Sequence, residues 1–167
     1  LVPFDPAWIH EVDKNFGTFK ALGVCEGERR LIFSVTDEDE RKARTILSSL
    51  RINVGHKLIG IHPGSNKIQG TRWPLSRYQE LVRRLKETRA ERVLVILGPV
   101  EEDMVDKFPD TPVIRGLSLG TLGALIKKFS LFVCNNTGVM HIAAAVGTRS
   151  IAICEALPEE WLPPGGY

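Results

Sequence analysis

The strongest constraint on the fold is a regular alternation of short apolar runs and amphipathic segments that begins at Lys57. The apolar runs have the length and composition of buried strands, and the segments between them carry apolar residues at helical spacing. Five strands are predicted, at residues 58–61, 92–97, 111–115, 131–134 and 150–154. Strands and helices that alternate in this way form a parallel sheet with helices on both faces, an α/β fold, and strands that are apolar throughout agree with a sheet covered on both sides.

The segments between the strands define the predicted helices. One helix is predicted to begin with a cap at Ser76, and its inward residues are Tyr78, Leu81, Val82 and Leu85. A second helix carries Leu119, Leu122, Leu125, Ile126 and Phe129 on one side. Residues 101–108 form a short acidic segment after the second strand.

The first 56 residues follow a different pattern. Trp8, Val12, Phe16 and Phe19 form one stripe of a helix within residues 6–22, which Gly23 would terminate. Residues 31–35 are predicted to form a short strand. The sequence Thr36-Asp-Glu-Asp39 resembles a capping box and predicts a following helix with Ala43, Ile46, Leu47 and Leu50 facing inward.

The leading candidate site is the stretch 131–147, which reads as strand, polar turn and alanine-rich helix. The start of a helix offers unpaired N–H groups and a positive dipole end, and both favour phosphate. Asn135, Asn136 or Thr137 can cap this helix, Gly138 lets a ligand approach the backbone, and His141 lies one turn further on. The alternative is that these residues only cap a helix and that His141 is a packed core histidine.

A second candidate loop, His62-Pro-Gly-Ser65, follows the strand at 58–61. In an open parallel sheet, ligands bind at the carboxyl ends of strands near a topological switch point, so the two loops could face one pocket. Residues 64–74 are rich in donors that fit a pyrophosphate or a sugar, namely Ser65, Asn66, Lys67, Gln69, Thr71 and Arg72. The alternative is an exposed loop anchored by Trp73.

Composition narrows the function classes. The chain has 167 residues, 43% of them hydrophobic and 25% charged, which is typical of a globular domain. A net charge of +2 gives no special reason to expect nucleic acid. Cys25, Cys134 and Cys154 lie far apart and indicate reduced thiols in a cytoplasmic protein. No apolar run approaches the roughly 20 residues of a membrane span, so any membrane contact is expected to be peripheral.

Several motifs are absent from the sequence. No CxxC or HExxH spacing occurs, and neither a metal nor another cofactor is predicted. The lack of GxGxxG and GxxxxGK[ST] argues against an ordinary dinucleotide oxidoreductase and against a P-loop NTPase. No residue stands out as a general base. The chain opens on Leu1-Val-Pro-Phe4 without an initiating Met, and we expect a piece of a longer protein.

Three segments together resemble the carboxy-terminal domain of glycosyltransferase family 9, which contains the ADP-heptose:lipopolysaccharide heptosyltransferases. They are His62-Pro-Gly-Ser65, Thr71-Arg-Trp-Pro74 and Asn136-Thr-Gly-Val-Met-His141 with the alanine-rich run to Gly147. The resemblance covers residues 57–163 and keeps the order and spacing of the motifs. It implies a Rossmann-like domain that forms one half of a GT-B glycosyltransferase, with residues 1–28 as an interdomain helix and linker and residues 29–167 as the donor-binding domain.

The resemblance also implies a function. Family members transfer a sugar from a nucleotide-diphospho-sugar with inversion and without a metal, and an ADP-heptose-like donor is expected here. The acceptor would be lipopolysaccharide or another cell-envelope glycan, at the cytoplasmic face of the inner membrane. The missing amino-terminal domain would supply the acceptor site and the catalytic carboxylate. No catalytic residue is therefore expected in this chain, and the piece alone is expected to be inactive.

Roles carry over to matching positions. Donor-binding residues would be Ser65, Asn66, Lys67, Thr71, Arg72, Asn136, Thr137, Gly138, Val139, Met140 and His141. The nucleobase would lie near Gly116, Leu117 and Ser118. Two positions depart from the family pattern, Thr71 in place of Lys and Asn136 in place of Asp. They favour the alternative of a non-catalytic nucleotide-sugar-binding or scaffold module. A Rossmann-like enzyme of another reaction type is disfavoured by the absent glycine fingerprint.

Overall fold

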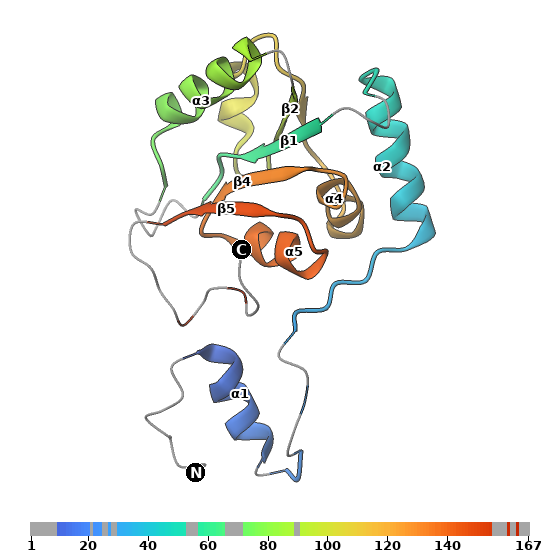
Figure 1. The fold of residues 1–167 in the computed structure, drawn as a ribbon, viewed down its shortest axis with the longest axis vertical. Coiled ribbons are helices and arrows are strands. Elements are labelled where there is room, and N and C mark those ends of the chain that lie inside the picture. Colours follow the sequence, from blue (N-terminus) through green and yellow to red (C-terminus); the bar gives the residue numbers. More distant parts are fainter. Residues whose placement is uncertain are drawn as a thin grey trace.

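The core of the molecule is a five-stranded parallel sheet with the order β3-β2-β1-β4-β5 (Figure 1). The computed structural model describes residues 10–20, 22–24, 27, 30–52, 57–65, 72–88, 91–154, 160 and 163. The strands are β1 (Lys57–His62), β2 (Glu91–Ile96), β3 (Val113–Ile114), β4 (Leu131–Asn135) and β5 (Ser150–Ile153). The predicted α/β class and all five strands from residue 57 onward are confirmed.

The strand order creates a switch point between β1 and β4. The chain adds β2 and β3 on one side of β1, then returns to add β4 and β5 on its other side. In the β1–β4 pair, His62 lies beside Cys134 at the carboxyl ends of the two strands. The loops that leave β1 and β4 therefore start next to each other, as the sequence predicted.

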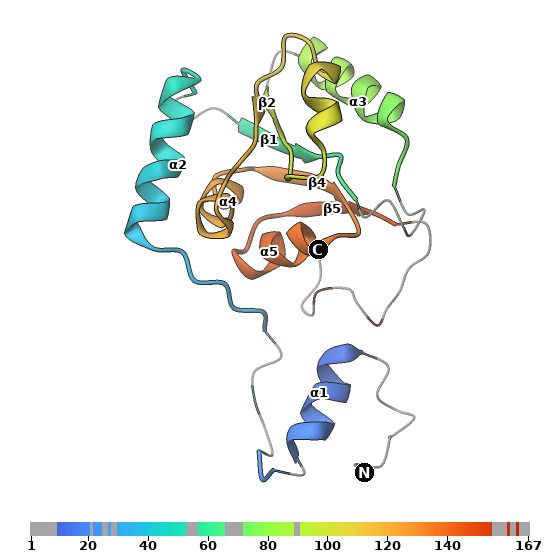
Figure 2. The same ribbon diagram turned by 180° about the vertical axis from the view of Figure 1, so that it is seen from behind.

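Helices cover both faces of the sheet (Figures 1 and 2). On one face lie α2 (Asp37–Ser49), α4 (Leu119–Ile126) and α5 (Gly138–Ala145), which pack around Phe132 of β4. On the other face lie α3 (Leu75–Glu87) and the 3₁₀-helix η2 (Glu102–Lys107), which pack around Ile61 of β1. Each face thus has its own hydrophobic cluster, and apolar strands are buried on both sides as predicted.

The predicted capping box starts α2. The Thr36 hydroxyl accepts a bond from the Asp39 N–H at 3.2 Å, and the Asp39 carboxylate accepts one from the Thr36 N–H at 3.3 Å. The same carboxylate also accepts a bond from the Thr121 hydroxyl at 3.1 Å. Because Thr121 belongs to α4, this cap also fixes α2 against α4.

Helix α1 (Glu11–Lys20) is shorter than the predicted helix at 6–22, and Trp8 lies outside the described residues. Gly23 has a φ of +82°, the left-handed conformation of a helix-terminating glycine, so its predicted role is confirmed. In both ribbon views α1 lies apart from the sheet (Figures 1 and 2). None of the described helices is both long enough and apolar enough to cross a membrane.

Two predictions about local structure are wrong. Residues 31–35 form no strand; they run as an extended connection from α1 to α2, away from the edge of the sheet where a strand could pair (Figure 1). Ser76 does not cap α3, because the helix already begins at Leu75. Pro74 occupies the N-cap position with a φ of −54° and makes no side-chain cap bond.

Gly60 of β1 gives a direct test of this packing. A Cβ at this position would lie 2.2 Å from the Phe129 ring, which itself stacks on Phe132 at 5.9 Å. We expect Gly60→Ala to lower the free energy of unfolding by about 2 kcal/mol in urea denaturation, because neither ring can yield. Combining it with Phe129→Leu should recover at least about 0.5 kcal/mol relative to the sum of the single variants. Strict additivity would contradict this contact.

Candidate functional site

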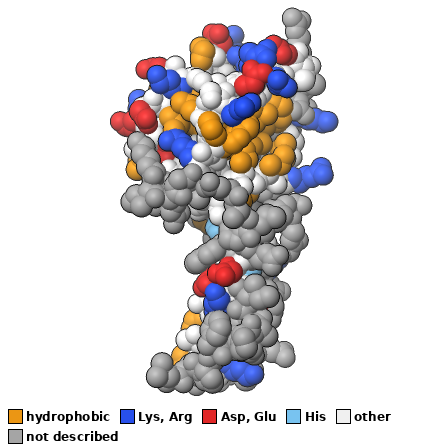
Figure 3. Space-filling model, turned by 90° about the vertical axis from the view of Figure 1, so that its left-hand side faces the viewer, with side chains coloured by type: hydrophobic (Ala, Val, Ile, Leu, Met, Phe, Trp, Pro, Cys, Tyr) orange, Lys and Arg blue, Asp and Glu red, His pale blue; other side chains and the backbone are white. Residues whose placement is uncertain are grey.

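A cavity of about 930 Å³ lies at the carboxyl edge of the sheet. Because the strands run toward the left-hand side of Figure 1, Figure 3 looks onto this edge and shows hydrophobic side chains gathered there with Lys and Arg around them. The wall is mostly apolar, and its polar side chains are His62, Ser65, Glu101 and Thr137. These residues lie at or just after the carboxyl ends of β1, β2 and β4. The cavity therefore spans the switch point, where an open α/β sheet binds its ligand.

The start of α5 forms one wall of the cavity. Thr137 is the N-cap residue, with Gly138 and Val139 after it, and all three line the cavity. The Thr137 side chain makes no cap bond, so the prediction that a side chain caps this helix is wrong for the residue at that position. Within the described part of the chain, no oxygen accepts a bond from the N–H of Gly138 or Val139. These donors and the helix dipole suit an anion.

Gly138 leaves this wall open. A Cβ added to it would meet no atom within 4 Å. The residue therefore has no packing requirement for glycine within the described chain, and the space beside its Cα is free for a ligand.

The other predicted residues of this segment do not line the cavity. The Met140 side chain is fully buried in the hydrophobic core, and its N–H bonds to the Thr137 carbonyl at 3.0 Å. Asn136 is partly buried and its N–H bonds to the Ile153 carbonyl at 3.2 Å. His141 is half-buried, and burial, with a smaller contribution from His10, lowers the pKa of its imidazole. Any role of Asn136 or His141 toward a ligand stays a prediction.

In the loop after β1, too, one predicted donor-binding residue lines the cavity and another does not. Ser65 is buried and lines the cavity. Arg72 instead contacts the other side of the sheet: its Nε donates to the Pro63 carbonyl at 3.2 Å, and its Nη2 lies 2.7 Å from the Met104 sulfur. Asn66, Lys67 and Thr71 lie outside the described residues.

Two of the three residues predicted to lie near the nucleobase line the cavity, and their role toward a base stays a prediction. Gly116 and Leu117 line the cavity, and Gly116 has a φ of +70°, which glycine adopts without strain. Ser118 does not line this cavity; its hydroxyl caps α4 by accepting a bond from the Thr121 N–H at 3.2 Å. Ser118 lines a neighbouring hollow of about 580 Å³ against α2.

Glu101 was not predicted as a site residue, because in the sequence it belongs to the acidic segment 101–108. This glutamate is only 4% exposed, lines the cavity, and receives no side-chain hydrogen bond from any described residue. A Cβ at Gly64 would lie 2.5 Å from its Oε1, and a Cβ at Gly98 would lie 2.6 Å from its Oε2. The two glycines therefore make room for the carboxylate. The sequence feature that could have indicated a buried side chain here is the pair of glycines, Gly64 and Gly98, that follow β1 and β2.

His62 lies beside Glu101 and was also not proposed as a site residue by itself. Its Nδ1 lies 3.0 Å from the Ile96 carbonyl, so Nδ1 carries a proton and donates to that oxygen. Burial lowers the pKa of the imidazole, and Arg72 adds to this, although the bond to Ile96 and the charge of Glu101 act in the opposite direction. The cavity therefore holds a neutral histidine next to a carboxylate.

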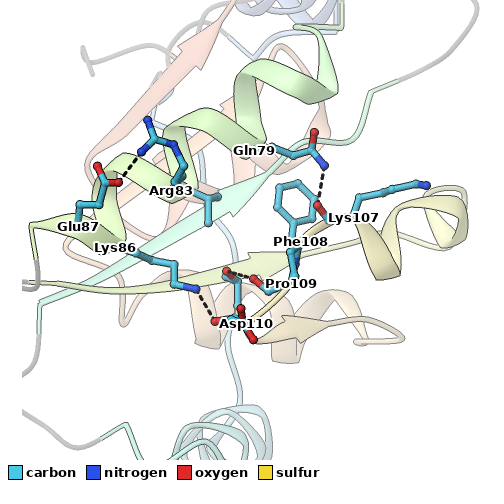
Figure 4. A pocket seen from close by; sticks show the side chains of 10 residues that line it. Gln79, Arg83, Lys86, Glu87, Lys107, Phe108, Pro109 and Asp110 are labelled. Atoms are coloured by element: carbon cyan, nitrogen blue, oxygen red, sulfur yellow. Dashed lines mark hydrogen bonds and ion pairs between the residues drawn. The ribbon is translucent and has the colours of Figure 1, made fainter.

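A second cavity, of about 570 Å³, lies between α3 and the segment after η2 (Figure 4). Several of its polar side chains bond one another or the backbone: Gln79 donates to the Lys107 carbonyl and Lys86 to the Asp110 carbonyl, both at 2.7 Å, and Arg83 pairs with Glu87. It lies toward the amino ends of the strands, away from the switch point. The described residues also contain no group of three His, Cys, Asp or Glu that could hold a metal ion.

Comparison with known proteins identifies relatives. The family model for glycosyltransferase family 9 (heptosyltransferase) matches residues 3–165. The chain is 28% identical over 153 residues to lipopolysaccharide heptosyltransferase 3 of Escherichia coli (strain K12), which covers 86% of this chain and 43% of that protein.

Solved structures share the fold. A family 9 glycosyl transferase from Veillonella parvula DSM 2008 superimposes with a TM-score of 0.84 at 23% identity, covering 94% of this chain and 47% of that one. The ADP-heptose lps heptosyltransferase II of E. coli gives a TM-score of 0.64 at 20% identity, with coverages of 81% and 43%. The chain spans less than half the length of each of these relatives.

The buried neutral histidine predicts a pH effect on stability. The folded-state pKa of His62 lies below its usual 6.5, so the unfolded chain binds the proton more tightly. Stability from this residue is therefore complete above about pH 6.5 and is lost as the pH falls below it. The variant His62→Asn keeps a donor toward Ile96 but does not titrate. Thermal unfolding between about pH 7.5 and 5 should show a shallower loss for the variant, by at most about 1.4 kcal/mol per pH unit. Parallel curves would contradict a neutral His62, since His141 and the acidic residues are common to both proteins.

Proposed function

The chain belongs to glycosyltransferase family 9, and from this premise we propose that it is the donor-binding half of a heptosyltransferase-like enzyme that binds a nucleotide-diphospho-sugar. One observation carries the proposal: a single cavity at the switch point combines a helix start whose first N–H groups have no acceptor among the described residues, an apolar wall and a buried carboxylate. These three features match the diphosphate, the base and the ribose of a nucleotide.

The diphosphate is assigned to the wall formed by α5. The N–H groups of Gly138 and Val139 and the helix dipole provide positive charge where a phosphate oxygen would lie. Ser65, at the end of β1, adds a hydroxyl from the opposite side of the switch point. Lys67, Arg72 and His141 stay predicted donors to the diphosphate. Lys67 lies outside the described residues, Arg72 bonds the Pro63 carbonyl, and His141 does not line the cavity.

The nucleoside is assigned to the remaining walls. Leu97, Leu117 and Val139 supply apolar surface for a flat base. Glu101 is a carboxylate, which only accepts hydrogen bonds, and the two hydroxyls of a ribose are suitable donors. A ribose in this cavity could donate to the Glu101 carboxylate, for which the described residues supply no side-chain hydrogen bond.

The reaction of the whole protein is part of the same proposal. An acceptor hydroxyl would attack the anomeric carbon with inversion, and the nucleoside diphosphate would leave toward the start of α5, where its charge is stabilised. The base that removes the proton from the acceptor is expected outside this chain. ADP-heptose is the proposed donor, because a relative with the same fold is named for it. Lipopolysaccharide is the proposed acceptor, and a cytoplasmic location at the inner membrane face belongs to the proposal.

Asn136 favours one alternative, a nucleotide-sugar-binding module without turnover. An amide at this position can donate as well as accept, unlike the aspartate of the family pattern. If Asn136→Asp in the full-length parent gained transfer activity from none, the binding module would be the better description.

Isothermal titration calorimetry of the chain with ADP, UDP and GDP tests the donor site. We expect one of the nucleotides to bind saturably, and Glu101→Gln to weaken it about tenfold because an acceptor for the ribose becomes an amide. Glu102→Gln is the matched control, since Glu102 is exposed and pairs with Arg115 at 3.7 Å outside the cavity. Equal effects of the two substitutions, or no binding by a folded chain, would contradict the proposal.

A further inference from the structure

Asn135, the last residue of β4, is a fully buried polar side chain that the proposed binding mode does not use. Its Nδ2 donates to the Pro63 carbonyl at 3.0 Å and to the Gly64 carbonyl at 2.9 Å. Its Oδ1 accepts a bond from the Trp73 N–H at 3.1 Å. Both amide protons and the amide oxygen thus have partners.

The orientation of the amide follows from these partners. Two carbonyl oxygens can only accept hydrogen bonds, so they must face the NH₂ group, and the Trp73 N–H must face the oxygen. A buried amide without partners costs a few kcal/mol, and a buried polar group with all partners present fixes its surroundings. No other neutral side chain of this size offers two donors and an acceptor in one plane.

These bonds join the two ends of one loop. Pro63 and Gly64 begin the connection from β1 to α3, here called the β1–α3 loop (residues 63–74), and Trp73 lies close to its end. Arg72 adds a second bond to the Pro63 carbonyl at 3.2 Å. The ends of the loop are therefore held together at a single point on β4.

The same residue leads directly into α5. Thr137 and Gly138 follow Asn135 by two and three positions, and the Thr137 hydroxyl lies 3.5 Å from the Asn135 carbonyl. The side chain of Asn135 thus holds the loop that carries Ser65, whereas its backbone continues into the helix start, where the described residues supply no acceptor for the N–H groups of Gly138 and Val139.

We propose that Asn135 is a positioning residue of the donor site, which clamps both ends of the β1–α3 loop to β4 and thereby sets the spacing between Ser65 and the start of α5. This inference rests on the proposed function. The motif at 136–141 does not include Asn135. In the proposed binding mode the diphosphate lies between Ser65 and the start of α5, and Asn135 fixes the separation of these two segments. Asn135 touches no substrate in this account.

Hydrogen exchange of the ligand-free chain tests the clamp itself. In Asn135→Ala, the Trp73 amide should exchange about tenfold faster, because the oxygen that accepts its bond is lost. Thr148→Val is the matched control: the buried Thr148 hydroxyl donates to the Ile126 carbonyl at 2.9 Å, far from the carboxyl edge. Equal exchange of Trp73 in Asn135→Ala and in Thr148→Val, at equal global stability, would overturn the clamp.

Nucleotide affinity tests what the clamp does. At pH 7.5, whichever of ADP, UDP and GDP the wild-type chain binds should bind Asn135→Asp at least about tenfold more weakly, because a carboxylate repels the Pro63 and Gly64 carbonyls. A protonated Asp regains one donor, and burial beside two carbonyls raises its pKa. The ratio of variant to wild-type affinity should therefore recover toward pH 5.5.

The ratio is used because His62, Glu101, Arg72 and His141 are present in both proteins, so it reports on the substituted residue. Affinity should be unchanged in Thr148→Val. A loss in Asn135→Asp that is the same at every pH, or that Thr148→Val shares, would overturn the positioning role. A folded wild-type chain that binds no nucleotide would instead overturn the proposed function, and Trp73 exchange would still decide whether the clamp exists.

Discussion

The parallel pairing of β1 with β4 is the constraint on which the rest of the site depends. Among the described strands, this pair joins the two neighbours that are farthest apart in sequence, with His62 beside Cys134. The loop after β1 and the turn before α5 are adjacent only because of this pairing, and Glu101 joins them because β2 lies on the other side of β1. The buried amide of Asn135 extends the same pairing beyond the last ladder bond, from the strands into the loop.

Much of this fold could be predicted from local sequence, since each strand of the sheet is a short apolar run and α2 begins at a capping box. Local sequence failed where the outcome depends on a distant partner. Residues 31–35 look like a strand, but no sheet edge lies beside them. The motif at 136–141 was read as one unit, yet its helical geometry turns Gly138 and Val139 to the cavity and buries Met140 in the core.

Glu101 shows the same limit at the site. In sequence it is one acidic residue among several, and its neighbour Glu102 is exposed. Its burial results from space left by Gly64 and Gly98, which follow two different strands. A carboxylate seated in this way is visible only once β1 and β2 are paired. The chain belongs to glycosyltransferase family 9. The solved structures at 20–23% identity share its fold.

The most direct test of the account is a nuclear magnetic resonance titration of the ¹⁵N-labelled chain with ADP, followed through backbone amide shifts. We expect the largest changes at Ser65, Gly116, Gly138 and Val139, which line the cavity at the switch point, and at Gly64, which lies beside Glu101. Changes confined to the cavity between α3 and residues 107–111, or none in a folded sample with UDP and GDP tested as well, would contradict it.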